Sequence, residues 1–410
     1  MTELDGSPVG AGEVDAGAFD RWWDELAPIG RAGSGGYRRF AWTHEDATLR
    51  EWFVGAATSL GLDVAGDRAG NLWAWWGDPD AHGDEPRGRG VVIGSHLDSV
   101  PDGGAFDGPL GVVSGLLAVQ ALQDRGFQPA RPVGVACFGD EEGARFGIAC
   151  AGSRLLTGAL SPDRARSLRD AEGTSMAEAM TAAGFEPGGL GRDDEALGRI
   201  GTFVELHVEQ GKGLVNTDSA VAVGSGIWPH GRWRVELVGR ADHAGTTHLA
   251  DRKDPMLDLA RLVTGARAAA ERHDAVATVG KVAVLPNGVN AIPSHVTAWL
   301  DCRADEEAAV RGVLADLREF GPAEESWTDR TSFHPALQNE LVRLLGAPVL
   351  ATGAGHDAGI LAQAGIPASM LFVRNPTGVS HSPDELAERD DCLAGVAALT
   401  RVVEHLAGRP

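Results

Sequence analysis

The sequence is poor in cysteine. Its 410 residues contain four, and no two of them form a Cys-x-x-Cys pair. The widely spaced thiols are Cys137, Cys150, Cys302 and Cys392. A disulfide framework or a zinc knuckle needs closely and regularly spaced cysteines, so this pattern favours reduced thiols with a structural role.

A long apolar run is also missing. The longest apolar stretch, around residues 111–122, is too short to span a bilayer. The first twenty residues are acidic and have neither the basic start nor the apolar core of a secretory signal peptide. We therefore expect a cytoplasmic protein with no membrane partner.

Basic residues are scarce as well. The chain has 36 lysines and arginines, only three of them lysine, against 58 acidic residues, which gives a net charge of −22. Such a charge repels nucleic-acid phosphates and anionic lipids, and no basic cluster offers a local exception. The 43% hydrophobic and 6% aromatic residues are ordinary for a globular protein, and the length suits two or three domains.

What the sequence does contain is an alternation of apolar strands and helices. Residues 89–96 indicate a buried strand, residues 107–126 a helix with Asp107 as its N-cap, and residues 131–140 the next strand. This strand–helix–strand order predicts a parallel sheet and hence an α/β fold. A further strand is expected at residues 201–211.

The pattern changes in the second half of the chain. Residues 231–242 and 295–304 alternate apolar and polar side chains, as half-exposed strands do, and each leads to a helical stretch. We interpret residues 226–327 as an inserted α+β domain. The first domain then comprises residues 1–225 and is completed by residues 328–410.

Polar side chains follow three of the expected strands. His96, the pair Glu141–Glu142 and His207 lie where strands end, and parallel strands bring such ends to one edge of the sheet. Asp98, two residues beyond His96, could accept the second ring N–H of a metal-binding His96. Imidazole and carboxylate donors without thiolate suit zinc, manganese, cobalt or nickel.

These residues also have plain structural interpretations. Asp107, at the head of its helix, could reach the same edge, or it could be only the helix cap. Glu141 and Glu142 could be solvated surface charges, and His207 could be a hydrogen-bonded histidine of the core. The shared placement at strand ends favours a metal site.

Several motifs run in order from about residue 30 to residue 390. They are GSHLDSV, GGAFDGPLGV, DEEGARFG, LHVEQG, DHAGTT, NAIP, DCR, GAGHDA and GVSHSPDE. Together they resemble the hydantoinase/carbamoylase amidohydrolases, a branch of the dinuclear-metal aminoacylase and dipeptidase superfamily. The eleven-residue spacing of His96 and Asp107, and a histidine at position 207, favour this branch over its peptidase relatives.

The resemblance implies an architecture and five metal ligands. The first domain would be a catalytic domain built on a mostly parallel sheet, and the insertion a ferredoxin-like lid and dimerisation domain, so we expect a homodimer. Each subunit would hold two divalent ions, zinc or manganese first, with cobalt or nickel also suitable. His96 and His207 would hold one ion, Glu142 and His381 the other, and Asp107 would bridge them.

Catalytic roles follow from the same resemblance. Glu141 would be the general base toward the attacking water, and Asp98 would orient His96. His243 would polarise the scissile carbonyl and stabilise the oxyanion, while Asn290 and Arg303 would bind the α-carboxylate of the substrate.

Some substrate contacts have alternatives. Arg303 could instead pair with Asp301 on the same strand face, and Asn290 could be a turn residue. Gln210 is expected to contact the ureido group, and His356 and Asp357 to line the pocket.

Arg374 departs from the family pattern. It comes seven residues before the expected ligand His381, at the end of an apolar run. A guanidinium there is costly to leave unpaired. It could receive a second carboxylate of the substrate, or a fixed carboxylate such as Asp384 or Glu385 could neutralise it.

The sequence thus predicts a metal-dependent hydrolase of a linear, non-peptide C–N bond. Allantoate is the first substrate candidate, followed by N-carbamoyl-L-amino acids and by N-formyl, N-formimino or other N-acyl amino acids. One alternative is an aminoacylase or dipeptidase of the same superfamily. Another is a metal-free, catalytically inactive binding homologue.

Overall fold

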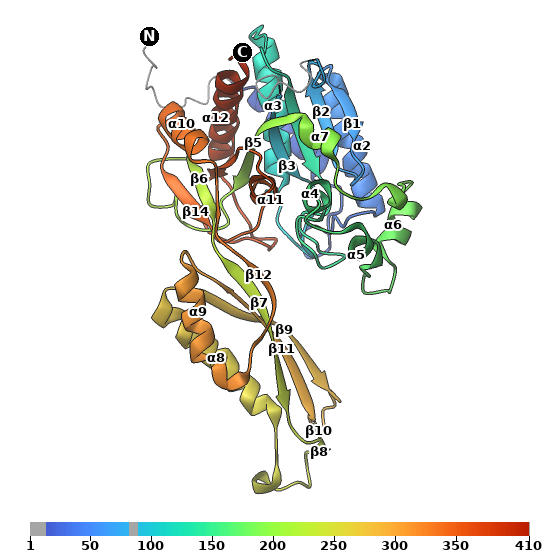
Figure 1. The fold of residues 1–410 in the computed structure, drawn as a ribbon, viewed down its shortest axis with the longest axis vertical. Helices are drawn as coiled ribbons and strands as arrows, with labels where there is room; N and C mark the ends of the chain where they lie inside the picture. Colours follow the sequence, from blue (N-terminus) through green and yellow to red (C-terminus); the bar gives the residue numbers. More distant parts are fainter. Residues whose placement is uncertain (1–13, 82–88, 410) are drawn as a thin grey trace. The chain divides into compact units, whose positions relative to one another are not determined.

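The computed structural model describes residues 14–81 and 89–409, which form two compact units (Figure 1). Unit 1 contains the described residues up to Ser225, Ser332–Leu350 and the described residues from Gly355 onward. Unit 2 contains Gly226–Thr331 and Ala351–Ala354. None of the described helices is long and apolar enough to cross a membrane.

A nine-stranded sheet lies at the centre of unit 1. Its strands are β1 (Asp63–Gly66), β2 (Leu72–Trp76), β3 (Gly90–His96), β4 (Val133–Phe138), β5 (Ile200–Val208), β6 (Val221–Ile227), β13 (Thr331–Ser332), β14 (Val349–Thr352) and β15 (Ala368–Val373). They are ordered β1-β2-β4-β3-β5-β15-β6-β13, with β14 paired to β6. The strands β4, β3, β5 and β15 are parallel, whereas β1, β2 and β6 pair antiparallel.

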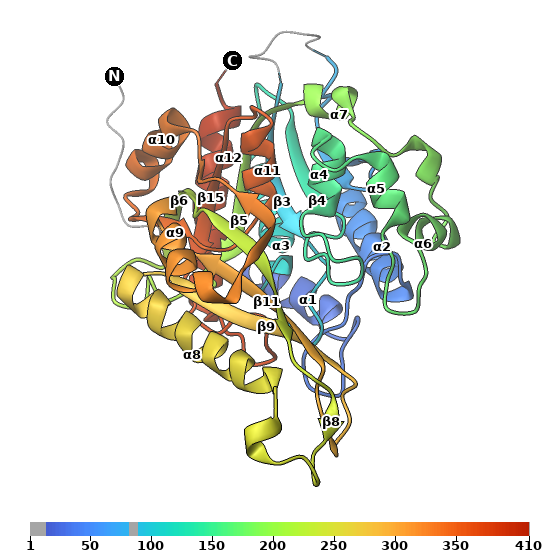
Figure 2. The ribbon, with the colours of Figure 1, turned by 60° about the horizontal axis from the view of Figure 1, so that its bottom comes forward.

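The parallel centre of the sheet is buried on both faces. Every residue of β3, β4 and β15 is buried, which explains why these strands are continuous apolar runs rather than alternating patterns. The strands β3, β4 and β5 lie side by side (Figure 2), as the strand–helix–strand reading of the sequence predicts. The predicted α/β fold with a mostly parallel sheet is confirmed.

Helices cover the sheet. Those of unit 1 are α1 (Ala16–Leu26), α2 (His44–Ser59), α3 (Pro109–Asp124), α4 (Ala151–Thr157), α5 (Pro162–Ser167), α6 (Met176–Ala182), the 3₁₀ turn η2 (Pro187–Gly189), α7 (Asp194–Gly198), α10 (Pro335–Leu345), α11 (Asp357–Gln363) and α12 (Arg389–Ala407).

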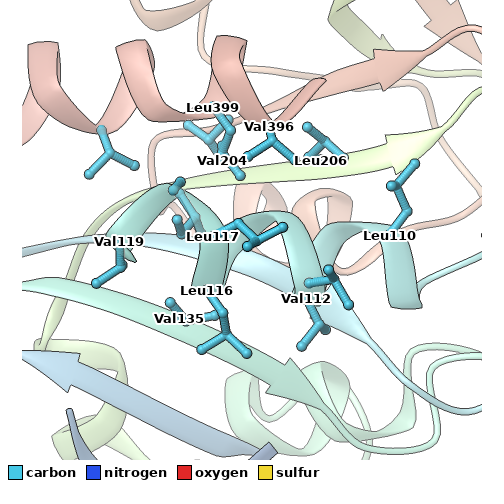
Figure 3. Close-up of a cluster of buried hydrophobic side chains, with 14 of the residues drawn as sticks. Leu110, Val112, Leu116, Leu117, Val119, Val135, Val204, Leu206, Val396 and Leu399 are labelled. Atoms are coloured by element: carbon cyan, nitrogen blue, oxygen red, sulfur yellow. The ribbon is translucent and has the colours of Figure 1, made fainter. Parts of the chain in front are cut away.

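The two faces of β5 have different neighbours. Val204 and Leu206 pack with apolar side chains of α3 and α12 in the main core (Figure 3). Glu205, between them, points to the opposite face, where its carboxylate accepts the backbone N–H of Ala358 in α11. By the same alternation His207 lies on the α11 side of the sheet, away from the apolar core.

Unit 2 is built around a four-stranded antiparallel sheet. Its strands are β7 (His230–Val238), β9 (Val276–Leu285), β11 (His295–Arg303) and β12 (Ala323–Thr328), in the order β12-β7-β11-β9. Its helices are α8 (Pro255–His273), α9 (Glu307–Asp316) and the 3₁₀ turns η3 (Leu249–Asp251) and η4 (Arg318–Phe320). The strand–helix–strand–strand–helix–strand order is that of a ferredoxin-like unit.

A two-stranded ribbon extends the sheet of unit 2. It pairs β8 (Asp242–His243) with β10 (Ala291–Ile292) and continues the ladder of β7 and β11 beyond Val238 and His295. In the four-stranded sheet, β7 and β11 alternate buried and more exposed residues. Trp233, Val235 and Leu237 of β7 belong to the core shared with α8 and α9. The sheet is therefore covered on one face by the helices.

Candidate functional site

Polar side chains meet where three parallel strands end. His96 is the last residue of β3, Glu141 and Glu142 follow β4, and His207 precedes the last residue of β5. His96, His207 and Glu141 are at most 5% exposed. Because these groups are buried, the interpretation of the glutamate pair as solvated surface charges does not hold.

A first group of candidate metal ligands is fully buried. It consists of His96, Asp107 and His207, whose ligand atoms all lie within 4.8 Å of one another. The Nε2 atoms of His96 and His207 are 3.6 Å and 3.1 Å from Oδ1 of Asp107. Their Nδ1 atoms lie near backbone carbonyls, 3.2 Å from Asp98 O and 2.9 Å from Val208 O. This leaves both Nε2 atoms directed at Asp107.

A second group shares the same aspartate. It consists of Asp107, Glu142 and His381, again with ligand atoms within 4.8 Å. Nε2 of His381 is 3.4 Å from Oδ2 of Asp107 and 3.6 Å from Oε2 of Glu142. Asp107 thus offers one oxygen to each group. The side chain of His381 is 51% exposed, so the second group is the more open one.

The donor atoms fit divalent cations. Nε2 of His96, Nε2 of His207 and Oε1 of Glu142 are buried without a hydrogen-bond partner among the described residues. Such atoms cost about 1–3 kcal/mol each when nothing satisfies them. Imidazole and carboxylate donors without a thiolate suit zinc, manganese, cobalt or nickel, and two groups joined by one carboxylate suit two ions.

Asp107 does not cap the following helix. The N-cap of α3 is Gly108, and no side chain makes a cap hydrogen bond there. The predicted cap is wrong, because the carboxylate turns toward the histidines instead. Burial opposes its ionisation, but the imidazoles of His207, His381 and His96 hold the pKa of Asp107 well below its usual range. Gly108 has a φ of +87°, and a Cβ there would lie 2.4 Å from the His96 ring, so only glycine permits this turn.

Glu141 lies beside the two groups without belonging to either. Its Oε2 is 3.7 Å from Nε2 of His96, and its Oε1 accepts a hydrogen bond from the Cys150 thiol at 3.1 Å. The carboxylate of Asp98 accepts the backbone N–H groups of Glu141 and Glu142 at 3.1 Å and 3.0 Å. Asp98 therefore holds the backbone of the glutamate pair, besides lying 3.4 Å from Nδ1 of His96. Burial raises the pKa of Glu141 well above its usual value.

Gln210 and His356 border the same site. Nε2 of Gln210 donates to Oδ2 of Asp107 at 2.8 Å and to Oγ of Ser380 at 3.1 Å. The His356 ring lies 4.5 Å from that of His207, and burial holds the pKa of His356 well below its usual value, so the ring is neutral. Oε1 of Gln210 and Nε2 of His356 have no hydrogen-bond partner in the described part of the chain. Asp357 is fully buried and accepts a hydrogen bond from Ser153 at 2.5 Å.

Glu385 has a role that the sequence pattern does not predict. Its Oε1 accepts the backbone N–H groups of Phe106 and Asp107 at 2.7 Å and 3.0 Å. Glu385 therefore holds the backbone of the shared aspartate. The signal in the sequence is the place of Glu385 four residues after His381 in one motif. The sequence-based prediction names Glu385 only as a partner for Arg374.

Arg374 is neutralised inside the protein. Its Nε and Nη2 atoms donate to the two carboxylate oxygens of Asp391 at 2.8 Å and 2.7 Å. A fixed carboxylate therefore satisfies the guanidinium, although it is neither Asp384 nor Glu385. The alternative of a fixed carboxylate is therefore realised, and a contact of Arg374 with a second carboxylate of the substrate stays a prediction.

Three predicted substrate residues lie in unit 2, in two separate places. His243 pairs with Ala291 across the β8–β10 ribbon, and the carbonyl of Asn290 accepts the backbone N–H of Ala244 at 2.9 Å. Arg303, at the end of β11, forms two hydrogen bonds with Asp301, of 2.7 Å and 3.0 Å. The alternative that Arg303 pairs with Asp301 is therefore realised.

The length of β11 separates these two places. Arg303 is its last residue, whereas His243 and Asn290 lie beyond its first residue, His295, in the ribbon at the tip of unit 2 (Figure 1). At about 3.3 Å per residue the strand spans roughly 26 Å. That exceeds the length of a carbamoyl amino acid. Asn290 and Arg303 of one chain therefore do not reach the same carboxylate, and their predicted binding of the α-carboxylate of the substrate stays a prediction.

Comparison with known proteins identifies the family of this chain. Residues 92–405 match the Peptidase family M20/M25/M40, and the chain belongs to that family. It is 38% identical to an N-carbamoyl-L-amino acid amidohydrolase of Geobacillus stearothermophilus, over 95% of this chain and 98% of the relative. It is 32% identical to the allantoate amidohydrolase of Escherichia coli K12, over 93% and 96%.

A solved structure agrees with the resemblance inferred from the motifs. An amidase of the hydantoinase/carbamoylase family from Burkholderia vietnamiensis superposes with a TM-score of 0.85 at 29% identity, covering all of both chains. The predicted family is confirmed.

Proposed function

We propose that the protein is a metal-dependent amidohydrolase that cleaves the linear C–N bond of an N-carbamoyl-L-amino acid, with allantoate as the second candidate. The single observation that carries this is the buried pair of ligand groups sharing Asp107, with the carboxylate of Glu141 beside them and outside both groups. The similarity to amidohydrolases along almost the whole chain supports it and moves the carbamoyl amino acid to first place.

The two groups would hold two divalent ions, which supply electrophilic activation of the carbonyl and of water when bound. Glu141 takes a proton from the attacking water and then delivers it to the departing nitrogen. Water adds to the carbamoyl carbon, the C–N bond to the amino acid breaks, and the resulting carbamate decomposes to ammonia and carbon dioxide. The free Oε1 of Gln210 is placed to accept a ureido N–H.

A homodimer is part of this proposal. β9 is an edge strand of unit 2 and exposes Val276, Val282 and Leu285, each 42–60% exposed. Such an edge is a template for pairing with a second chain. If His243 and Arg303 both contact one substrate, two chains must supply them. Sedimentation analysis that finds only monomers would contradict the dimer.

A substrate panel tests the function. We expect protein reconstituted with Mn²⁺ or Zn²⁺ to release ammonia from N-carbamoyl amino acids or allantoate, and chelated protein to release none. N-formyl and N-formimino amino acids and a plain dipeptide belong in the same panel. Cleavage of the dipeptide without any ureido hydrolysis would establish the peptidase alternative, and a protein that never takes up metal would establish the binding homologue.

Arg303→Lys is expected to raise KM strongly, because an ammonium cannot reproduce the two-pronged contact of a guanidinium with a carboxylate. We expect the loss to shrink when the carboxylate of the substrate is amidated. Steady-state kinetics with both substrates provide the measurement. Equal damage with both would mean that Arg303 only pairs with Asp301.

A further inference from the structure

Among the candidate ligands, His381 is the one whose position the fold restrains least. It lies outside the helices and strands, and its side chain is 51% exposed, whereas those of Asp107 and Glu142 are 7% and 8% exposed. Its backbone φ of +55° is in the left-handed region, which few non-glycine residues adopt. Packing therefore contributes little to the position of His381. The segment before it must fix that position instead.

One buried side chain organises that segment. Asn375 is 0% exposed, and its Oδ1 accepts the backbone N–H groups of Thr377 and Gly378 at 3.0 Å and 2.9 Å, and the Thr377 hydroxyl at 2.9 Å. Its Nδ2 donates to the carbonyl of Val379 at 2.8 Å. All of these hydrogen bonds lie within the turn that leads to His381.

The amide is suited to this arrangement because it both accepts and donates. Aspartate would keep the acceptor but face the carbonyl of Val379 with an oxygen, and alanine would leave the N–H groups of Thr377 and Gly378 without this partner. On its other side the turn begins at Arg374, which Asp391 holds by two hydrogen bonds. The turn is thus anchored at its start and tied internally by Asn375.

We propose that Asn375 is a positioning residue for the second metal ion: it holds the turn in the shape that places the imidazole of His381 opposite Asp107 and Glu142. This rests on the proposed dinuclear function. Asn375 touches none of the ligand side chains in the described hydrogen bonds, so it acts through the backbone. Its loss should weaken the second ion selectively, since His96 and His207 are held by β3 and β5.

Titration of the metal-free protein with Zn²⁺ or Co²⁺ tests the proposal. We expect wild type to bind two ions, and Asn375→Ala to bind the first with unchanged affinity and the second about 10–100-fold more weakly, the usual effect of losing a residue that orients a ligand. Activity of the variant should return at high metal concentration with an unchanged KM. A general structural defect would not be rescued in this way.

Controls separate the possible failures. Asn339→Ala, the same change on the exposed face of α10, should behave as wild type. Asn375→Asp keeps the acceptor and should weaken the second ion less; it decides the matter if the alanine variant does not fold. If both Asn375 variants bound two ions with wild-type affinity, the proposal for Asn375 would be overturned but the dinuclear function would not. Uptake of only one ion by wild type would overturn the dinuclear function itself.

Discussion

Asp107→Ala is expected to abolish activity and to cost the protein its second ion. Oδ1 of Asp107 faces His96 and His207, and Oδ2 faces His381. Two divalent cations held close together repel one another, and the negative charge between them offsets that repulsion. Without the shared carboxylate the second group keeps only Glu142 and the exposed His381. Elemental analysis after dialysis, together with turnover at saturating substrate, provides the measurement.

Two controls give this result its meaning. Asp102→Ala removes a carboxylate from the same loop, but Asp102 bonds to Arg38 and Ser34 at the surface, so activity should be kept. Asp107→Asn keeps the shape of the side chain and removes its charge, and should also lose the second ion. Two tightly held ions in Asp107→Ala would reject the bridging role.

The sheet and the meeting point of the polar residues could be predicted from sequence because both follow from local pattern. β3 and β4 are continuous apolar runs separated by one helix, which predicts parallel strands. Neighbouring parallel strands end at one edge of the sheet, so the residues that follow them lie close together whatever the conformation of the loops. His96, Glu141 and His207 were found in this way.

The sequence-based predictions that failed concern side chains whose partners lie far away in the sequence. Arg374 pairs with Asp391, seventeen residues later in α12, and Glu385 bonds the backbone of Asp107 across 278 residues. No periodicity predicts such contacts, because they depend on how loops and helix starts approach one another. The prediction that Asp107 caps α3 failed for a related reason: Gly108, in a left-handed conformation, redirects Asp107 away from α3.

Asn290 and Arg303 show what motif resemblance leaves open. The resemblance assigns both residues to one carboxylate of the substrate and takes no account of the strand that separates them. The ladder of β11 with β7 runs without interruption from His295 to Arg303, and that register alone sets their separation. The register depends on pairing with a distant strand, which the motifs do not contain.

Glu141→Gln is expected to keep both ions and to lower kcat by about 10²–10⁴, the usual contribution of positioned general acid–base catalysis and equivalent to about 3–5 kcal/mol. Glu141 belongs to neither ligand group, so its charge is not needed to hold metal. An amide cannot take a proton from water at neutral pH, but its oxygen can still accept the Cys150 thiol, so the local structure should persist. Metal content and kcat measured on one preparation test both halves.

Glu142→Gln is the matched control, because it makes the same isosteric change one residue along the chain. Glu142 faces His381 at 3.6 Å within the second ligand group, so this variant should lose the second ion and regain part of its activity at high metal concentration. Glu141→Gln should gain nothing from added metal, because its defect lies in proton transfer. If Glu141→Gln lost an ion while Glu142→Gln kept two, the roles of the neighbouring carboxylates would be reversed: Glu142 would be the base.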